Sequence, residues 1–318
     1  MTSPLDLEAK HFTDFDGRFK ARLAAVIPTR AAVIDARSAP TTAKYDCRIK
    51  VEYNKDLMRL IEEGMLVAVR NFKSNSEYPR KYTLMEISRV YPEHYGLRGL
   101  SDHAYYPLQF EVIDQSVADW ASDDRSTLMV QISAIPTNYD FIINSDKQPE
   151  YVKGFSYPVI GERVHILNKE TVDLMYNHKI LKKLPILEVG SSVGTMKMFE
   201  ADPEKVPIYV DFENLVRYHF GIFAFTGGGK SNLVSTLVRK ILRTLDDVKV
   251  VIFDISQEYP FLLLDVFRDS SISSKIILDS PASTLDEFYA SVVKPRGFEE
   301  DPRVRKALTG ILQDGKVA

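Results

Sequence analysis

The feature that most constrains the fold of this chain is a run of three glycines between two apolar segments of different periodicity. Residues 221–232 read GIFAFTGGGKSN, so an apolar stretch of strand-like composition leads directly into the glycines. The residues that follow recur at helical spacing and form one apolar stripe: Leu233, Leu237, Ile241 and Leu245. A strand, a tight turn and a helix packed on a sheet form the basic unit of α/β folds, so this segment predicts an α/β domain.

The glycines, with Lys230 and Ser231, match the Walker A pattern of phosphate-binding loops. Glycines allow successive backbone N–H groups to point at phosphate oxygens, and the positive end of the following helix dipole points to the same place. Lys230 would reach the β- and γ-phosphates of ATP, and the Ser231 hydroxyl would bind Mg²⁺. The predicted nucleotide-binding residues are Thr226, Gly227, Gly228, Gly229, Lys230, Ser231 and Asn232.

One position departs from the pattern. Ala224 stands where the loop usually has its first glycine, and its small side chain is expected to distort the turn little. The alternative to a nucleotide site is a plain glycine turn between a strand and a helix.

A second candidate element follows the apolar segment 248–255. This segment contains Asp254, and Glu258 follows four residues later. Carboxylates at the carboxyl edge of a parallel sheet lie beside bound phosphates. Asp254 and Glu258 therefore join Lys230 of the glycine loop as the candidate catalytic residues. Asp254 has three possible roles: the magnesium-binding Walker B aspartate, a carboxylate on a neighbouring strand, or a cap of the following turn. We favour the neighbouring strand because no adjacent glutamate is present to orient water.

The first half of the chain has the pattern of short β-strands, with apolar and polar residues alternating between turn-forming clusters. The expected strands are Cys47–Tyr53, Met65–Val69, Tyr82–Val90, Leu108–Ile113, Leu128–Ile135 and Val164–Leu167. Trp120 is interpreted as a packing residue. Six short strands favour a small barrel or sandwich. We therefore expect an all-β barrel domain over residues 1–180.

Residues 181–318 instead alternate strands with helices, as in an α/β domain. The expected strands are Pro207–Val210, Gly221–Phe225, Val248–Ile255 and Lys275–Leu278. The expected helices are Lys230–Leu245, Thr284–Val293 with a Thr284–Glu287 capping box, and a last helix capped by Asp301.

Composition excludes several classes of protein. The single cysteine, Cys47, cannot form an internal disulfide or a cysteine-based zinc site. The first residues lack a signal peptide and no apolar stretch approaches the roughly 20 residues of a membrane span, so we expect a cytoplasmic protein without a membrane partner. The net charge is −3, but residues 101–150 hold nine acidic and two basic side chains, so one stretch is distinctly acidic.

Together these features resemble the HerA branch of the HerA/FtsK ATPases, the archaeal and bacterial ring-shaped DNA translocases. The resemblance is carried by ILEVGSSVG at 186–194, by residues 206–232 through the Walker A loop, and by DISQEY at 254–259. Gln257 stands where the last motif of the family has a glycine. The β-rich region resembles the family's N-terminal HAS barrel, which helps to assemble the ring and dock partners.

The resemblance implies a multidomain chain in which an all-β barrel precedes an α/β P-loop NTPase domain of the RecA-like (ASCE) type. It also implies ATP and Mg²⁺ as cofactors, a homo-oligomeric hexameric ring, double-stranded DNA as the polymer, and a NurA-type nuclease as partner. The family's Walker B Asp-Glu pair and arginine finger lie well downstream, and no apolar segment ending in Asp-Glu follows here. We therefore expect the front part of a longer polypeptide, incomplete at its C-terminus, that binds ATP but barely hydrolyses it.

Two other functions stay open. A nucleotide-gated factor of the same ATPase family could dock a ribosomal subunit through the acidic stretch, because an acidic face prefers basic protein surfaces to DNA phosphates. A structural ring subunit could bind nucleotide without turnover.

Overall fold

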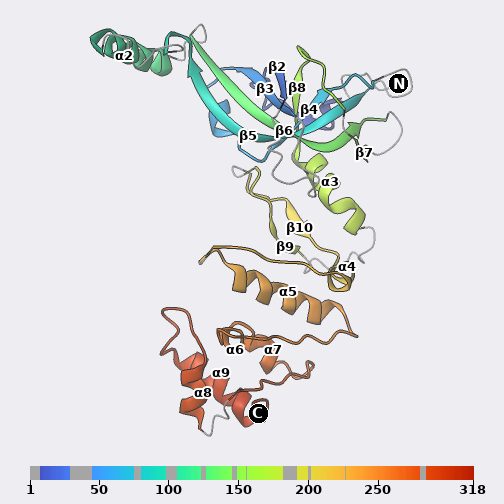
Figure 1. Ribbon diagram of the computed structural model, residues 1–318, viewed down its shortest axis with the longest axis vertical. Coiled ribbons are helices and arrows are strands. Elements are labelled where there is room, and N and C mark those ends of the chain that lie inside the picture. Colours follow the sequence, from blue (N-terminus) through green and yellow to red (C-terminus); the bar gives the residue numbers. More distant parts are fainter. Residues whose placement is uncertain are drawn as a thin grey trace, which may run out of the picture. The chain divides into compact units, whose positions relative to one another are not determined.

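The structure is a computed structural model (Figure 1). It describes residues 8–28, 45–74, 80–97, 106–122, 127–144, 149–154, 156–181, 192–199, 202–225, 227–279 and 284–318. Two compact units emerge: Met1–His178 with Thr195–Val206, and Lys179–Gly194 with Pro207–Ala318. Among the described helices, none is long and apolar enough to cross a bilayer.

An antiparallel sheet of eight described strands forms most of the first unit. Its order is β1 (Phe12–Thr13), β8 (Val164–Leu167), β4 (Leu66–Arg70), β5 (Lys81–His94), β6 (Leu128–Ile142), β3 (Tyr45–Glu52) and β2 (Ala21–Pro28), with β7 (Glu150–Lys153) paired to β6. β2 also reaches back to β8. The Leu23 amide donates to the Glu162 carbonyl at 3.1 Å, and the Gly161 amide donates to the Leu23 carbonyl at 2.8 Å. The sheet therefore closes on itself.

Alternation of side chains along the strands builds the core of this sheet. In β3 the residues Tyr45, Cys47, Ile49 and Val51 are buried, while the residues between them are partly or fully exposed. Burial raises the pKa of the Cys47 thiol to about 12, so the cysteine is an inert core residue. The strand predictions around Cys47, Met65, Tyr82, Leu128 and Val164 are confirmed, whereas β1, β2 and β7 were not predicted.

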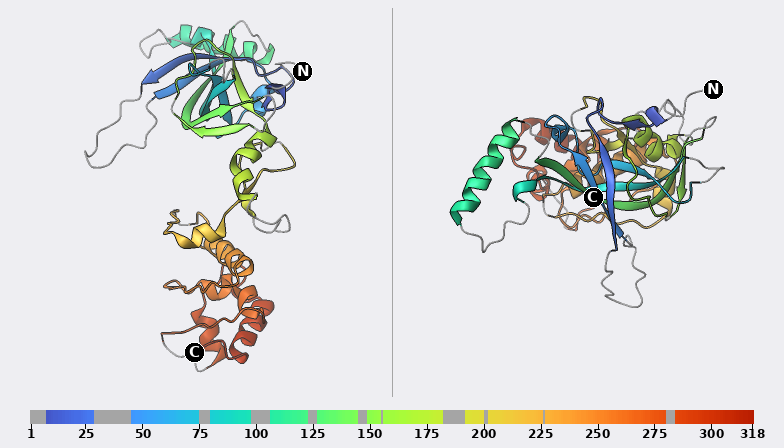
Figure 2. Two further views of the ribbon diagram at one scale, coloured as in Figure 1. Left: turned by 90° about the vertical axis from the view of Figure 1, so that its right-hand side faces the viewer. Right: turned by 90° about the horizontal axis from the view of Figure 1, so that it is seen from above.

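One predicted strand of this region is wrong. Residues 108–113 lie inside helix α2 (Tyr106–Ser122), which occupies the connection between β5 and β6. Phe110, Ile113 and Val117 recur at helical spacing, and this period of three to four residues prevails over the local β-like composition. Trp120 packs edge-on against Tyr53 with ring centroids 5.0 Å apart, which agrees with its interpretation as a packing residue. Figure 2 shows α2 projecting from the sheet.

Short elements complete the first half of the chain and lead into the second. They are the 3₁₀ turns η1 (Leu57–Arg59) and η2 (Tyr95–Leu97), helix α3 (Lys169–Leu181), and the two-stranded sheet of β9 (Ser192–Thr195) and β10 (Pro207–Tyr209).

The second unit is mainly helical. Its helices are α4 (Phe212–Arg217), α5 (Lys230–Thr244), α6 (Tyr259–Leu262), α7 (Leu264–Arg268), α8 (Leu285–Ser291) and α9 (Pro302–Gln313). The predicted α5 is confirmed to within one residue at its end. The predicted capping box of α8 is present, because Thr284 and Glu287 each accept the other's backbone amide. Asp301 caps α9 by accepting the Arg303 amide at 2.8 Å.

The three later strand predictions are not realised. Segments 221–225 and 248–255 belong to no strand, and in 275–278 only Ile276 forms a β-bridge, with Val317. Ile222 and Ile252 pack on the α5 side, but Phe223 is 95% exposed and Ile255 is 100% exposed. A strand of a parallel sheet is covered on both faces. Within the described residues, segments 221–225 and 248–255 are covered on one face only. They have the composition of strands, but no described neighbouring strand is hydrogen bonded to them.

Candidate nucleotide-binding site

The glycine loop before α5 has a backbone that only glycine accommodates easily. Gly227 has φ 82° and Gly229 has φ 78°, both in the left-handed region. The Gly228 amide donates to the Phe225 carbonyl at 2.9 Å and so closes the turn. A Cβ atom on Gly228 would lie 3.0 Å from that same carbonyl oxygen. Each of the three glycines is therefore required by the conformation of the loop.

The off-pattern alanine is compatible with this turn. The Ala224 methyl carbon would lie 3.2 Å from a Cβ atom at Gly228, so the two positions face each other across the loop. Because Gly228 has no side chain, the Ala224 methyl group has room. The loop therefore accommodates alanine in place of the usual first glycine, because Gly228 leaves space for its methyl group. Thr226, the remaining predicted loop residue before the glycines, lies outside the described residues.

The start of α5 leaves backbone donors available to an anion. Gly229 is the N-cap and supplies no side chain to cap the helix, and the first turn carries no acidic residue. The Leu233 amide makes the first hydrogen bond, to the Gly229 carbonyl at 2.9 Å. In the described part of the chain, the amides of Ser231 and Asn232 have no backbone acceptor. The positive end of the helix dipole and these donors favour a bound phosphate.

The side chains at this end of α5 suit a nucleotide with its metal. Lys230 is exposed at the first helical position and Ser231 is half-buried beside it. The Lys230 ammonium group can donate hydrogen bonds to a triphosphate, and the Ser231 hydroxyl oxygen can serve as a ligand for Mg²⁺. Asn232 contributes its backbone carbonyl to the helix, where it accepts the Ser235 and Thr236 hydroxyls, each at 2.9 Å.

The Asp254 carboxylate holds a turn. One oxygen accepts the Tyr259 amide at 2.8 Å, and the other accepts the Ser256 hydroxyl at 3.2 Å. These contacts correspond to the capping role among the three that the sequence left open. Glu258 is the N-cap of α6, but its side chain makes no capping hydrogen bond. Gln257, between the two acids, has φ 56°, a left-handed conformation that glycine adopts at lower cost.

Asp254 and Glu258 both act electrostatically on the Tyr259 side chain. Burial raises the pKa of the Tyr259 hydroxyl, and the charges of Asp254 and Glu258 raise it further. Tyr259 and Ile252 pack with Val238 of α5, so the turn lies against the helix that carries the glycine loop. Among the hydrogen bonds and ion pairs of the described residues, none joins either acid to Lys230 or Ser231.

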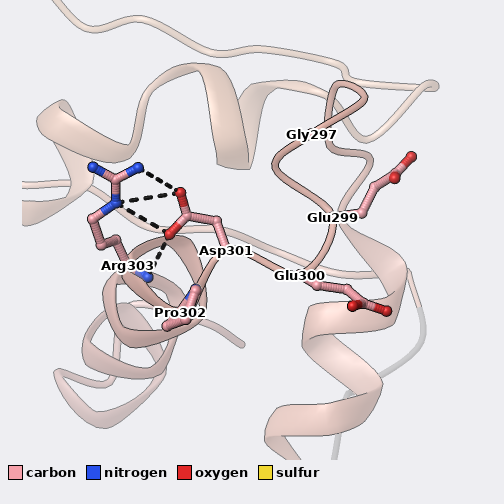
Figure 3. A pocket seen from close by; sticks show the side chains of 6 residues that line it. All are labelled: Gly297, Glu299, Glu300, Asp301, Pro302 and Arg303. Carbon is pink, nitrogen blue, oxygen red and sulfur yellow. Dashed lines mark hydrogen bonds and ion pairs between the residues drawn. The ribbon is translucent and has the colours of Figure 1, made fainter.

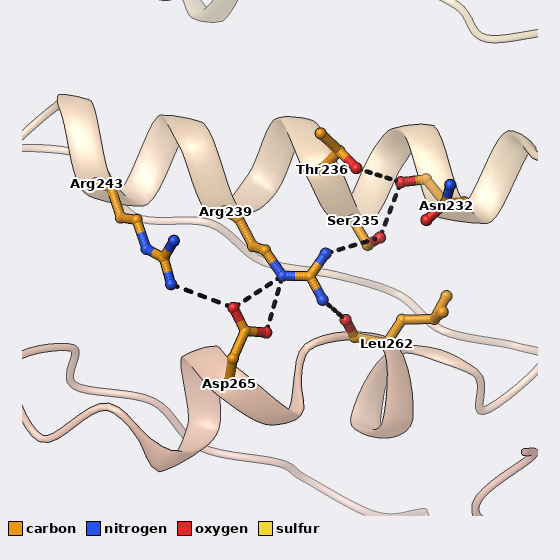
Figure 4. A network of polar contacts seen from close by, with 7 residues as sticks. All are labelled: Asn232, Ser235, Thr236, Arg239, Arg243, Leu262 and Asp265. Carbon is orange, nitrogen blue, oxygen red and sulfur yellow. Dashed lines mark hydrogen bonds and ion pairs between the residues drawn. The ribbon is translucent and has the colours of Figure 1, made fainter. Parts of the chain in front are cut away.

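An arginine–aspartate network, which sequence reasoning missed, fixes α5 against α6 and α7 (Figure 4). The Arg239 Nε donates to both Asp265 oxygens, at 2.8 and 2.9 Å, and another nitrogen donates to the Leu262 carbonyl. Arg243 donates to the same carboxylate at 3.2 Å. These arginines are paired within the unit, so their charges serve the packing of the helices behind the loop.

A surface hollow at the start of α9 is a separate feature (Figure 3). It is lined by Gly297, Glu299, Glu300, Asp301, Pro302 and Arg303. Asp301 in it is already occupied, as the helix cap and as the ion-pair partner of Arg303 at 2.8 Å. The surplus of carboxylates makes this hollow unsuited to a phosphate group.

A closed glycine turn at a helix start, followed by Lys and Ser, is the arrangement of a P-loop nucleotide-binding site. Comparison with known proteins points to the same region. Residues 189–293 match the family model for the central domain of helicase HerA. A stretch of 101 residues is 32% identical to the probable DNA double-strand break repair helicase HerA of Methanocaldococcus jannaschii. The alignment covers 32% of this chain and 19% of that relative. The two comparisons support a HerA-like ATPase at this general level.

Proposed function

We propose that this chain is part of a ring-forming P-loop ATPase of the HerA type, which uses ATP to move double-stranded DNA in repair or end processing. The observation that carries the proposal is the hydrogen bond from the Gly228 amide to the Phe225 carbonyl, with Gly227 and Gly229 in left-handed conformations at the uncapped start of α5. The match of residues 189–293 to the HerA central domain supports it. The name of the M. jannaschii relative supports the DNA repair role.

In this proposal each residue of the loop has a defined task. The amides of Gly227, Gly228 and Gly229 surround the phosphates, and Lys230 neutralises the charge at the β- and γ-positions. Ser231 holds Mg²⁺ through its hydroxyl. Bound MgATP supplies the phosphoryl group whose transfer to water releases energy. Asp254 acts from a distance by holding the turn that presents Glu258.

The first experiment measures nucleotide binding itself. Wild-type chain titrated with a fluorescent ATP analogue in Mg²⁺ is expected to show saturable binding, and Lys230→Ala is expected to weaken it at least tenfold, as for loss of one charge-assisted contact. The matched control is Lys306→Ala, because Lys306 is an exposed lysine on α9, outside the glycine loop. Equal affinity in wild type and Lys230→Ala contradicts the nucleotide site.

The second experiment tests the polymer. ATP hydrolysis by the purified full-length polypeptide is expected to rise when linear double-stranded DNA is added, and Lys230→Ala is expected to abolish both basal and stimulated rates. DNA binding through phosphate contacts is expected to weaken steeply with salt. Hydrolysis that is indifferent to DNA, in protein that binds ATP normally, counts against the translocase role while leaving the nucleotide site intact.

The closed sheet of the first unit is proposed to be the HAS-barrel-like module of such a ring. The hexameric state and a NurA-type nuclease partner follow from the resemblance and remain proposals. The ribosomal alternative remains a prediction, motivated by the acidic stretch 101–150, in which α2 carries no lysine or arginine. Co-sedimentation separates the two: ATP-dependent comigration with ribosomal particles favours the factor, and salt-sensitive duplex binding favours the translocase.

A further inference from the structure

The outer face of the closed sheet carries two arginines on either side of one serine. Arg48 of β3 is paired with Ser133 of β6, and Arg89 of β5 is paired with the same serine on its other side. Side chains that are directly opposite in an antiparallel pair point to the same face, with Cβ atoms about 5 Å apart. Both arginines are exposed, and Ser133 is half-buried. The three side chains form one row across neighbouring strands, which we call the arginine row (Figure 1).

A β-bulge places Arg89 in the arginine row. The pairing of β5 with β6 shifts by one residue between Ile87 and Arg89, and Ser88 is the extra residue. Without the shift, Ser88 would lie opposite Ser133, and Arg89 would lie opposite the buried Ile132. The bulge is fixed, because the Ser88 hydroxyl donates to the Ser133 carbonyl at 3.0 Å. Bulges re-aim side chains at functional positions, and this one turns a guanidinium group out of the core.

Small side chains form the rest of the arginine row. A second bulge, in β2, places Ala25 opposite Arg48 and leaves Ala24 as the extra residue. Between the two arginines stands Ser133, whose side chain is also small. No large side chain of the row therefore separates the two guanidinium groups, and an anion can approach both of them and the serine hydroxyl.

The positive charges of the arginine row are not neutralised by ion pairs. Among the described residues, no ion pair includes Arg48 or Arg89. Asp46 precedes Arg48 by two residues and Glu86 precedes Arg89 by three, but neither carboxylate lies within ion-pair distance of an arginine. Two guanidinium groups without a counter-charge, within reach of one hydroxyl, are the donors of an oxyanion site.

The neighbouring row of the same face shows the contrast. Lys50 is paired with Gln131 across β3 and β6, and its ammonium group donates to the Glu93 carboxylate at 2.7 Å. It also donates to the Gln131 side chain, whose amide nitrogen in turn contacts the Tyr91 hydroxyl. The charge of Lys50 is therefore satisfied within the sheet, whereas the charges of the arginine row are left for a ligand.

We propose that Arg48, Ser133 and Arg89 bind a phosphate group on the outer face of the sheet. Two guanidinium groups and a hydroxyl approach from three directions, and the tetrahedral oxygens of a phosphate can accept from all of them. A carboxylate has two coplanar oxygens, which one arginine already satisfies. The phosphate belongs to a free polyphosphate or to a nucleic-acid backbone, and the contact is the same in both. The site does not rest on the proposed function, because its residues lie outside the unit with the glycine loop.

Calorimetric titration with pyrophosphate tests the site in a Lys230→Ala chain, in which binding at the glycine loop is weakened. Saturable binding is expected. Arg48→Ser with Arg89→Ser is expected to weaken it at least tenfold, because two charge-assisted contacts are lost. Arg48→Lys with Arg89→Lys keeps both charges but loses the bidentate geometry of the guanidinium group, so an intermediate loss is expected.

A matched control separates the site from general charge attraction. Lys55→Ser with Arg59→Ser removes two exposed positive charges of the same unit outside the arginine row. It is expected to leave pyrophosphate affinity within about twofold of the background chain, because exposed charges at a distance are screened. Unchanged circular dichroism and thermal unfolding show that each variant is folded.

A short fluorescent DNA duplex, titrated in the same background, distinguishes the two sources of phosphate. For a nucleic-acid backbone, the double serine variant is expected to bind the duplex at least tenfold more weakly, and the slope of log affinity against log salt is expected to fall by about two. For a free polyphosphate, only the affinity for pyrophosphate falls. Either result supports the phosphate site.

Four results overturn the proposal: neither probe binds, the double serine variant binds both probes like the background chain, the control variant loses as much affinity as the serine variant, or a polyglutamate peptide binds with the affinity and arginine dependence of pyrophosphate. The last result assigns the arginine row to an acidic protein partner. Binding of fluorescent ATP to chains with intact Lys230 reports the proposed function separately.

Discussion

The Asp254 carboxylate accepts the backbone amide of Tyr259 at 2.8 Å, five residues along the chain, and so closes the turn before α6. The turn packs against α5 through Ile252 and Tyr259. Asp254 therefore connects the apolar segment 248–255 with the helices behind the glycine loop, and its contacts are those of a structural residue.

The first prediction follows from this hydrogen bond. Asp254→Ala is expected to lower the free energy of unfolding by about 1 kcal/mol, because it removes a side-chain cap of a backbone amide. ATP affinity is expected to change much less than in Lys230→Ala. Chemical denaturation and nucleotide titration measure the two effects. A large loss of Mg²⁺-dependent ATP affinity with unchanged stability indicates instead that Asp254 acts on the metal.

Gln257 gives a second prediction, with the opposite sign. Its φ of 56° costs a non-glycine residue about 1–2 kcal/mol, and glycine avoids this cost. Glycine also loses more conformational freedom on folding, which offsets part of the gain. Gln257→Gly is therefore expected to raise the free energy of unfolding by about 0.5–1 kcal/mol. The Gln257 carbonyl accepts the Val293 amide at 2.9 Å, and glycine keeps this bond. Gln257→Ala retains the strain, so a gain in that control contradicts the explanation.

A third prediction concerns the middle glycine of the loop. In Gly228→Ala the new methyl carbon meets the Phe225 carbonyl oxygen at 3.0 Å and the Ala224 methyl carbon at 3.2 Å. The loop must open to relieve these contacts, so ATP affinity is expected to fall at least tenfold. Gly194→Ala is the matched control, because a Cβ atom there meets nothing within 4 Å and the backbone is not left-handed. Normal ATP binding by Gly228→Ala indicates that the nucleotide does not need this turn.

The sequence predicted those parts of the molecule whose signal is local. The start of α5, the capping box at Thr284 and the alternation along β3 depend on neighbouring residues, and the structure has each of them. The prediction of a strand at 108–113 was wrong because six residues rich in apolar side chains fit the period of a strand as well as that of a helix. Only the apolar spacing that continues to Val117 distinguishes helix α2 from a strand.

Features that depend on distant residues were beyond sequence reasoning. Arg239 and Asp265 are 26 residues apart and carry no motif, yet they join α5 to α7. Asp140 lies in a strand, where a charged residue is expected to face solvent, but it is buried because it pairs with Lys81 at 3.5 Å and also hydrogen bonds with the side chains of Asn71 and Ser156. Segments 221–225 and 248–255 have the composition of strands, but a strand also needs a neighbour, which composition does not specify.

The last prediction uses Cys47, the chain's one thiol, as a probe of the closed sheet. Burial raises its pKa from the ordinary 9.0 to about 12, so the folded protein holds almost no thiolate at pH 8. Labelling by iodoacetamide at pH 8 is therefore expected to proceed only through opening of the sheet, and to accelerate sharply in denaturant. The stabilisation from the neutral thiol is present below pH 9 and is lost as the pH rises towards 12. A Cys47→Ser chain provides the blank, and labelling of the folded protein at the rate of a free thiol contradicts the buried position of this strand.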